Sequence, residues 1–428
     1  MKSPRPSMEK LLGFLAIFGH CICLTLLPAQ AQEIAITTPR GIYTLKVAGK
    51  PAGQSQARTY FGVQLLPDIR FQGLASNVAG TSLRFNEIPY SSFADAERKS
   101  YIHVMDGNGR GFIVDIEEFR ANDFRCANDL TGWIQPGTKV SLRPHPHLAD
   151  LFGADNKFGL TSGSGADAAD NVVVWDPVAQ QEKVYYFHSS RSRWEEEGIE
   201  SDASRAIMRF PYGFYIVRRT PGTLRIVLSG TIGADPLLLP VRTGANVFSL
   251  PVNLSASLEN LVSATGDFPV LSGVNSSQAD LLTFEEPFTG NQRGPFYHSS
   301  RPNAEGWREI GETAGGTGDA MDLLSTLILR RTGAPGYVRV EGSLVPNPSA
   351  LPLPPDPEPG ETPLMGEMAI PPGSSDRFLQ VQTSTDLQTW SPVPGVTLIP
   401  GSNTRVEFPL PGGQTRSFYR LIALPYWY

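Results

Sequence analysis

The middle of this 428-residue chain contains one pattern twice, and this repetition constrains the fold more than any other feature. The tetrads His188-Ser189-Ser190-Arg191 and His298-Ser299-Ser300-Arg301 lie 110 positions apart. Further matches follow at offsets of 113 and 112, among them Trp194 with Trp307 and Arg218-Arg219-Thr220 with Arg330-Arg331-Thr332. Small loop insertions account for the changing offset. Because repeated segments share fold more often than chemistry, the pattern predicts one β-module used twice.

The local pattern predicts an all-β fold. Glycine (42 residues) and proline (37 residues) are abundant, and apolar residues come in short runs between turn signals, without sustained helical periodicity. Leu224–Leu228 alternates with period two and should bury one face, whereas Val172–Trp175 has the continuous apolar character of a strand covered on both faces. We therefore expect tandem related β-modules of sandwich or barrel type and a small C-terminal sandwich-like β-module.

The first 31 residues are expected to be a cleaved signal peptide. A basic segment at residues 2–10 precedes the apolar stretch Leu11–Leu27, and Ala29-Gln30-Ala31 has the small-x-small pattern of a cleavage site. A transmembrane anchor is the alternative, but the apolar stretch contains His20 and ends at the cleavage motif. The sequence thus predicts export to the periplasm, the cell surface or the extracellular medium, with no membrane span after cleavage.

Charge and cysteine content argue against a nucleic-acid-binding protein and against a protein stabilised by internal disulfides. Removing the signal takes away three basic residues and one acidic residue, so the formal charge moves from -6 to -8. Nucleic-acid binding needs a basic face, so no nucleic-acid partner is expected. Cys126 is the one cysteine left, so the chain cannot form an internal disulfide and must be held together by core burial.

Composition and the repeat together predict six segments. Five prolines between positions 352 and 359 indicate a stiff, extended linker. The predicted order is a signal peptide (1–31), an N-terminal β-rich domain (32–160), β-module copy 1 (161–232), β-module copy 2 (233–345), a Pro-rich linker (346–376) and a C-terminal β-module (377–428).

Two resemblances accompany these predictions. The first rests on Tyr101–Val104, Gly109, Gly111, Phe112–Ile116, Arg143–His145, Leu148–Gly153, Asp170–Trp175, Tyr185, Tyr186 and Trp194. With these residues, the span from Gly41 to Val345 resembles an uncharacterised family of exported paralogous proteins in verrucomicrobial bacteria. The C-terminal module, with Phe378, Val381, Ser384–Leu387, Trp390 and Phe418–Arg420, is similar to an accessory β-module of secreted proteins in the same bacteria. The resemblance implies a Gram-negative exported protein and brings no known activity.

The repeated His, Arg and Trp residues are the candidate ligand-binding site. The set comprises His188, Arg191, Trp194, His298, Arg301 and Trp307. A catalytic interpretation would make His the base and an adjacent Ser the nucleophile, but neighbouring strand residues point to opposite faces and the sequence locates no orienting acid. Stacking on a sugar or peptide is a better functional interpretation. A structural role is favoured over both, with each Trp filling the core of its copy.

Two further patterns are compatible with metal binding, but we expect neither of them to bind a metal ion. Asp106–Glu117 matches several positions of a calcium loop. Arg110 occupies a ligand position, however, and the flanks have strand character, so a glycine-rich hairpin is favoured. His145 and His147 form an H-x-H pair, but prolines flank and separate them and no third ligand lies nearby in sequence. We expect no metal and no cofactor.

The acidic residues leave one enzymatic alternative. Glu195–Glu197 and Glu285-Glu286 are compatible with a two-carboxylate glycosidase, although charged loop faces are the favoured interpretation. Asp170 and Asp280 are best interpreted as strand-entry turns in which the carboxylate binds backbone amides.

The sequence as a whole favours an exported, non-enzymatic binding or structural protein, with an extracellular glycan or another surface component as its partner. The alternative is a secreted polysaccharide hydrolase. The sequence leaves the ligand and the oligomeric state open.

Overall fold

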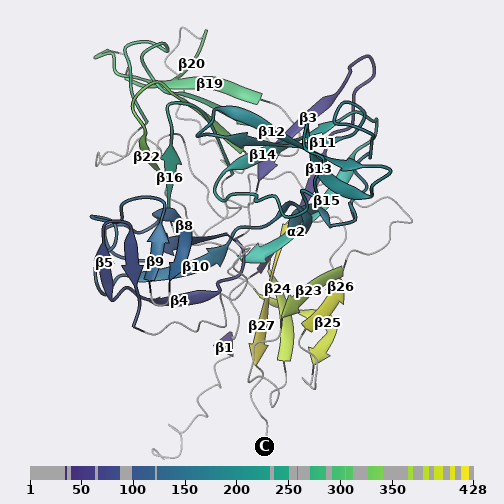
Figure 1. Ribbon diagram of the computed structural model, residues 1–428, viewed down its shortest axis with the longest axis horizontal. Helices are drawn as coiled ribbons and strands as arrows, with labels where there is room; N and C mark the ends of the chain where they lie inside the picture. Colours follow the sequence, from purple (N-terminus) through teal and green to yellow (C-terminus); the bar gives the residue numbers. More distant parts are fainter. Residues whose placement is uncertain are drawn as a thin grey trace, which may run out of the picture.

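The computed structural model is almost entirely β, as the sequence predicts (Figure 1). It describes residues 34–35, 40–62, 66–86, 99–120, 123–231, 236–249, 258, 270–285, 292–303, 305–311, 326–340, 365–369, 379–384, 390–398, 405–409 and 416–423. The predicted signal peptide lies outside these residues. Helix α2 (Leu148–Phe152) is short, and across the described ranges no helix has the length and apolar character needed to span a bilayer.

The molecule contains two five-stranded antiparallel sheets whose strand orders correspond. The first sheet has the order β13 (Arg193–Glu196), β12 (Gln181–His188), β11 (Asn171–Asp176), β14 (Gly213–Arg218) and β3 (Ala57–Gly62). The second sheet has the order β20 (Gly306–Glu309), β19 (Gln292–Ser299), β18 (Leu281–Glu285), β21 (Thr326–Arg331) and β17 (Gly244–Ser249). In each sheet, three consecutive strands lie side by side and the fourth returns beside the first of them.

Each sheet is accompanied by an antiparallel pair of strands, here called a ribbon, and the two ribbons are formed in the same way. In one ribbon β15 (Leu224–Thr231) pairs with β2 (Arg40–Val47), and in the other β22 (Gly336–Val340) pairs with β16 (Leu237–Val241). We call β2, β3 and β11–β15 the first unit, and β16–β22 the second unit.

The first unit therefore begins much earlier in the chain than residue 161. Its strands β2 and β3 come from the segment predicted as an N-terminal domain, and they pair with β15 and β14 respectively. This pairing differs from the predicted boundary at residue 160. The local sequence does not reveal it, because β2 and β3 belong to this unit through pairing with strands far along the chain.

A separate domain is inserted between β3 and β11. Its seven-stranded sheet has the order β4 (Phe71–Leu74), β10 (Lys139–Pro144), β7 (Ser100–Val104), β8 (Ile113–Arg120), β9 (Asp123–Cys126), β6 (Ser82–Arg84) and β5 (Asn77–Ala79). This domain has its own core, which includes Leu238 from β16 of the second unit. Leu238 N donates to Gly111 O at 2.9 Å, so the inserted domain docks on the second ribbon.

The C-terminal strands continue the first ribbon. The sheet runs β15, β2, β27 (Arg416–Ala423), β24 (Leu379–Ser384) and β25 (Ser391–Leu398), and β1 (Ile34–Ala35) also pairs with β27. A second layer pairs β23 (Met365–Ala369) with β26 (Arg405–Pro409). Val227 of β15 packs against the core of this module.

Two features differ from the predicted Pro-rich linker and C-terminal β-module. Residues 365–369, predicted as part of the Pro-rich linker, form strand β23. Strand β27 pairs with β2 over four residue pairs, from Arg40 with Tyr419 to Tyr43 with Arg416, so the last module and the body share a sheet. Proline content indicates local stiffness, but it does not indicate where the chain that follows will pair.

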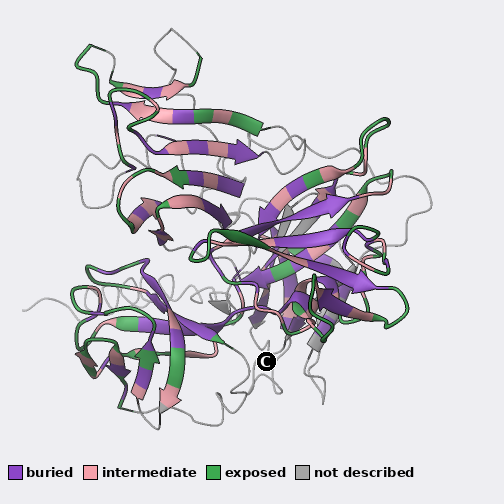
Figure 2. Ribbon diagram, turned by 45° about the horizontal axis from the view of Figure 1, so that its top comes forward, coloured by how far each residue is buried: buried purple, intermediate pink, exposed green. Residues whose placement is uncertain are grey.

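The two units share one hydrophobic core. Buried residues of both sheets and both ribbons belong to a single cluster, which includes Phe61, Trp194, Phe214, Phe248, Trp307 and Leu327. Figure 2 shows buried positions along the strands of both sheets and exposed positions concentrated in loops. Burying one large apolar side chain contributes about 1.5–3 kcal/mol, so this shared cluster couples the stability of the two units.

Candidate functional site

The strand register places the two repeated histidines at different positions. On β12, Tyr185 lies opposite Val172 and Phe187 lies opposite Trp194. On β19, Phe296 lies opposite Leu282 and His298 lies opposite Trp307. His298 is therefore the counterpart of Phe187, and His188 is the counterpart of Ser299. The interpretation of His188 and His298 as matched residues is wrong.

A β-bulge explains the one-residue difference. The pairing of β18 with β19 shifts register between Leu282 and Phe284. Gly294 lies in this segment with φ +98°, and a Cβ added to it would lie 2.8 Å from Leu282 O. An extra residue in one strand moves every following side chain to the opposite face. The two His-Ser-Ser-Arg tetrads are thus alike in sequence while their side chains face opposite sides of their sheets.

The two tryptophans are buried, as predicted. Trp194 is 0% exposed and Trp307 is 6% exposed. Each meets the edge of a ring on the neighbouring strand, Phe187 at 5.5 Å and His298 at 5.6 Å between ring centroids. Trp194 Nε1 donates to Gly153 O at 2.8 Å, whereas Trp307 Nε1 has no acceptor within the described residues. Both indoles fill the core and neither is available to a ligand.

A buried aspartate at the start of β11 holds the first unit together. Asp170 accepts hydrogen bonds from Thr161 N at 2.8 Å and from Arg219 N at 2.7 Å. Its Oδ2 also lies 2.8 Å from Arg218 Nε, in an ion pair whose side chains are 0% and 7% exposed. The carboxylate thus fastens the loop before β11 to the end of β14.

Asp280 makes the corresponding contacts in the second unit. It accepts from Leu271 N at 2.9 Å and from Thr332 N at 3.0 Å, and it pairs with Arg331 Nη1 at 2.8 Å. Arg331 therefore takes the place of Arg218, an offset of 113, so the Arg-Arg-Thr match at 112 is also one residue out of register. The polar feature that both units share is this clamp.

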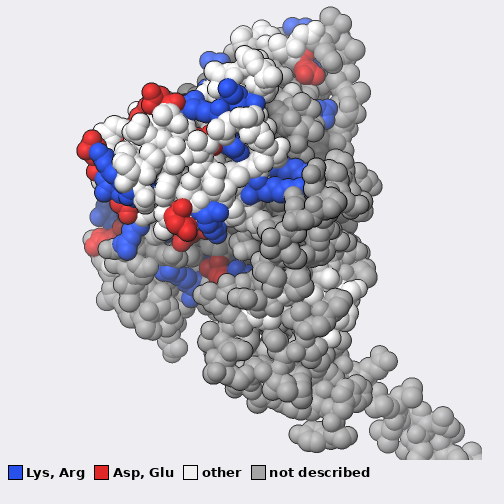
Figure 3. Space-filling model, turned by 90° about the vertical axis from the view of Figure 1, so that its right-hand side faces the viewer, with Lys and Arg blue, Asp and Glu red and all other residues white. Residues whose placement is uncertain are grey.

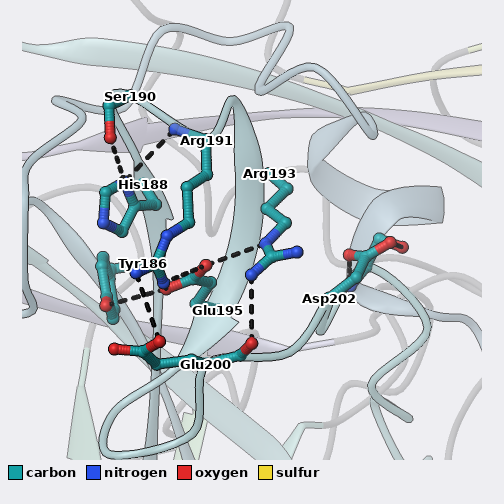
Figure 4. Close-up of polar contacts among 9 residues, drawn as sticks. Tyr186, His188, Ser190, Arg191, Arg193, Glu195, Glu200 and Asp202 are labelled. Carbon is teal, nitrogen blue, oxygen red and sulfur yellow. Dashed lines mark hydrogen bonds and ion pairs between the residues drawn. The ribbon is translucent and has the colours of Figure 1, made fainter.

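The outer face of the β12–β13 hairpin carries the polar cluster shown in Figure 4. His188 Nδ1 faces Arg191 N and Ser190 Oγ, both at 3.4 Å. Nucleophile–base pairs usually lie within about 2.6–3.2 Å, so the Ser190 contact is long. Nδ1 is also shared with a backbone amide, and this arrangement favours a turn-stabilising role for His188 over activation of Ser190.

Glu195 lies beneath two arginines on this face. It is 1% exposed, accepts from Arg191 Nη1 at 3.0 Å through both oxygens, and accepts from Arg193 Nε at 2.8 Å. Tyr186 Oη donates to it at 3.3 Å. Burial by itself raises the pKa of Glu195, but the hydrogen bonds and charges of the two arginines outweigh burial and lower the pKa below its ordinary value. The interpretation of Glu195 as part of a charged loop face is wrong.

The hairpin of the second unit differs at this place, because Arg308 lies opposite Tyr297 where Glu195 lies opposite Tyr186 in the first unit. Arg301 is exposed and its Nε donates to Val274 O at 2.7 Å. His298 Nδ1 contacts Ser272 Oγ at 3.0 Å, and burial lowers the pKa of His298. The six candidate residues are therefore His188 and Arg191 together on one hairpin, two buried tryptophans, His298 against Trp307, and a separate exposed Arg301, instead of two equivalent sites.

The two metal-like patterns have structural partners. The Asp106–Glu117 segment joins strands β7 and β8, and Asp106 Oδ1 accepts from Lys139 N at 2.8 Å. His145 Nε2 lies 2.9 Å from Asp115 Oδ1, and its Nδ1 accepts from Phe210 N at 3.1 Å. Over the described part of the chain, no group of three or more His, Cys, Asp and Glu side chains is placed to hold a metal ion.

Two buried groups have strongly raised pKa values. Burial raises the pKa of the Cys126 thiol to about 12, so it stays protonated at neutral pH and is a poor nucleophile. Burial also raises the pKa of Glu285 to about 7. Glu285 is 2% exposed and belongs to strand β18, so the interpretation of this residue as part of a charged loop is wrong. Glu285 contacts Tyr60 of the first sheet, and no local sequence pattern predicts this contact.

The charged surface is mixed in sign. On the face shown in Figure 3, Lys and Arg side chains lie among Asp and Glu side chains around uncharged surface. Comparison of the chain with family models, curated proteins and solved structures finds no match.

Proposed function

We propose that the protein is an exported, non-enzymatic binding or structural protein of the cell surface or extracellular space. The observation that supports this most is the use made of its polar side chains. Asp170 and Asp280 are clamps between strands, and Glu195 is neutralised by Arg191 and Arg193. Acids engaged in this way hold a scaffold in place and are poorly suited to proton transfer.

We also propose that the two seven-stranded units are copies of one module. Their sheets and ribbons correspond in strand order, and their Asp clamps make corresponding contacts. A shared fold with divergent surface loops is the usual design of a repeated binding or structural scaffold.

The surface best suited to a ligand is the β12–β13 hairpin of the first unit. Arg191 and Arg193 have side chains that are 37% and 36% exposed. Glu195 and Glu200 fix both guanidinium groups, the latter through its side chain to Arg191 Nη2 at 3.3 Å and through its carbonyl oxygen to Arg193 Nη2 at 3.1 Å (Figure 4). Fixed planar donors bind hydroxyl and carboxylate groups at a low entropic cost, so we propose a glycan as the ligand.

The alternative of a polysaccharide hydrolase has less support. Such an enzyme needs two carboxyl groups about 5–10 Å apart across the scissile bond, one of them an acid with a raised pKa. Glu195 has the opposite pKa shift and lies beneath two arginines. Glu285 has a raised pKa but is 2% exposed and hydrogen-bonded to the backbone of β3.

A glycan-binding screen of the purified exported protein tests the proposal. Arg191→Ala should weaken binding at least about tenfold, the equivalent of about 1.4 kcal/mol. Arg301→Ala is the matched control, because Arg301 occupies the same place in the second tetrad and its Nε donates to a backbone carbonyl oxygen, Val274 O. Release of reducing sugar ends by the wild-type protein, or a ligand whose affinity is unaffected by Arg191→Ala, would contradict the proposed site.

A further inference from the structure

Three polar residues form a buried row across the second sheet. Thr326 of β21 lies opposite Ser249 of β17 on one side and opposite Glu285 of β18 on the other. Thr326, Ser249 and Glu285 are almost completely buried, with exposed fractions of 1%, 1% and 2% respectively. Opposite residues of neighbouring antiparallel strands have Cβ atoms about 4.5–5.5 Å apart. The Glu285 carboxyl group therefore lies in a row with two hydroxyl-bearing side chains.

This row lies against the edge strand of the first sheet. Glu285 Oε1 accepts a hydrogen bond from Tyr60 N of β3 at 3.0 Å, although the two residues are 225 positions apart. Close by, a Cβ added to Gly62 would lie 2.4 Å from Ser249 Cβ, so the backbone of β3 touches the second sheet directly. Glu285 is thus the acceptor that satisfies an outward-facing amide of β3 at the junction between the sheets.

The junction supplies hydrogen bonds to Glu285 but no cation within the described residues. On β3, Arg58 lies over the Tyr215 ring, 5.4 Å from its centroid, and its side chain hydrogen-bonds to Tyr60. Tyr215 Oη donates to Glu182 Oε1 at 2.6 Å. On β19, the Gln292 side chain hydrogen-bonds to Glu285. The groups that face this junction from β3, β14, β12 and β19 therefore leave the carboxylate without a partner of opposite charge.

Ser249 Oγ and Thr326 Oγ1 are buried, and neither has a hydrogen-bond partner among the residues that the structure describes. A buried hydroxyl without a partner is costly. A protonated carboxyl group carries an O–H donor that such an oxygen accepts, whereas an ionised carboxylate in the same place keeps the hydrogen bonds of Tyr60 and Gln292 but is a buried charge with no opposite charge beside it among the described residues.

We propose that Glu285 is a proton-operated joint between the two sheets. Proton uptake by its carboxyl group strengthens the contact of β3 with the second sheet, and proton release weakens it. The Tyr60 amide keeps its acceptor in both states, so what changes is the cost of burying charge at the junction.

The sign of the effect follows from the direction of the pKa shift. Burial raises the pKa of Glu285 from 4.5 to about 7 in the folded protein. Between these two values the folded state holds a proton that the unfolded state has lost. The stabilisation is therefore complete below pH 4.5, decreases as the pH rises through about 7, and is constant above that.

Hydrogen exchange of the full-length protein tests the joint. After correction for intrinsic exchange rates, peptides that contain β3 should lose protection about tenfold or more between about pH 5.5 and pH 8. In Glu285→Gln, an uncharged mimic that still presents an oxygen to Tyr60, β3 protection should be independent of pH over this range. Glu309→Gln, at the far edge strand of the same sheet, is the matched control and should behave as the wild type.

A second variant covers the case in which Glu285→Gln does not fold. Thr326→Val keeps the shape of the side chain and removes a hydroxyl oxygen that can accept from the protonated carboxyl group, so the loss of β3 protection should move to lower pH. A pH-independent β3 in the wild type would overturn the proposal. So would a Glu285→Gln protein that keeps the wild-type pH dependence, or, where that variant does not fold, a Thr326→Val protein with an unchanged transition.

Discussion

The first and second units have sheets of the same strand order around one shared core, but they differ in what they present at the surface. In each, a Trp fills the core and a buried Asp fastens the loop before the third strand of the unit, β11 or β18. The hairpin of the first unit holds Arg191 and Arg193 around Glu195, whereas the hairpin of the second unit has Arg301 bound to a backbone carbonyl. The difference indicates that folding requirements keep the interior contacts alike, while the exposed hairpins are under separate constraints.

The two ribbons show the same contrast at a larger scale. In the first unit, β2 pairs with β27, and Val227 packs on the C-terminal module. In the second unit, Leu238 enters the core of the inserted domain. Each ribbon therefore has one face toward the common core and another that carries an accessory domain, and a different domain occupies each.

Removing either tryptophan should have the largest effect. Trp194→Ala and Trp307→Ala should each cost about 3–5 kcal/mol, the usual range for emptying an aromatic site in a packed core. The measurement is the free energy of unfolding from urea titration. A large loss in one variant and an unchanged midpoint in the other would break the equivalence of the two units. Unchanged stability in both would show that neither indole is a core residue.

Replacing the aspartates of the two clamps should have the next largest effect on stability, and the two replacements should differ in size. Removing one partner of a buried ion pair costs about 3–5 kcal/mol because the remaining charge stays buried. Arg218 is 7% exposed and Arg331 is 14% exposed. Asp170→Asn should therefore destabilise more than Asp280→Asn, toward the upper and lower parts of that range respectively. Thermal unfolding of both variants beside Asp176→Asn, a partly exposed aspartate of β11, checks the order.

The same comparison explains what the sequence predicts and what it does not. The all-β fold, the burial of Trp194 and Trp307, and the amide-binding role of Asp170 follow from alternation, from repeated landmarks and from the chemistry of Asp near strand starts. These are local signals. The pairing of β27 with β2 and the contact of Glu285 with Tyr60 join residues far apart in the chain, and no local pattern encodes them.

Sequence identity was also misleading at the tetrads. His188 and His298 share neighbours, yet a one-residue bulge in β19 gives His298 the place of Phe187. A register change inverts which side chains face the core without changing the composition of the strand. The repeated histidines therefore looked like a shared site, although the feature that the units share is the Trp on the adjacent strand.

Replacing Trp by Phe should destabilise the two units to different extents, and this difference should be smaller than the effects above. Trp194 Nε1 donates to Gly153 O, and its removal leaves that carbonyl group without this donor. Trp307 Nε1 has no acceptor within the described residues. A buried group that loses its partner costs about 1–3 kcal/mol, so Trp194→Phe should be about 1 kcal/mol more destabilising than Trp307→Phe. Equal costs in urea titrations would contradict a stabilising role for the Gly153 contact.

The smallest effect tests the register directly. Because His298 occupies the place of Phe187, His298→Phe should fit the core and change the free energy of unfolding by no more than about 1 kcal/mol, the apolar gain offsetting the lost Ser272 contact.

Burial lowers the pKa of His298 from 6.5, so the unfolded chain binds this proton more readily, and the wild type should lose stability as the pH falls below 6.5. His298→Phe should lack that part of the acid-side loss. Urea titrations at about pH 5 and pH 8 measure both quantities, with His188→Phe as the comparison, because His188 accepts from the Arg191 amide and a Phe there should leave that turn weaker. A loss above about 2 kcal/mol in His298→Phe would mean that the site requires a polar side chain, and that the two hairpins differ by more than one residue of register.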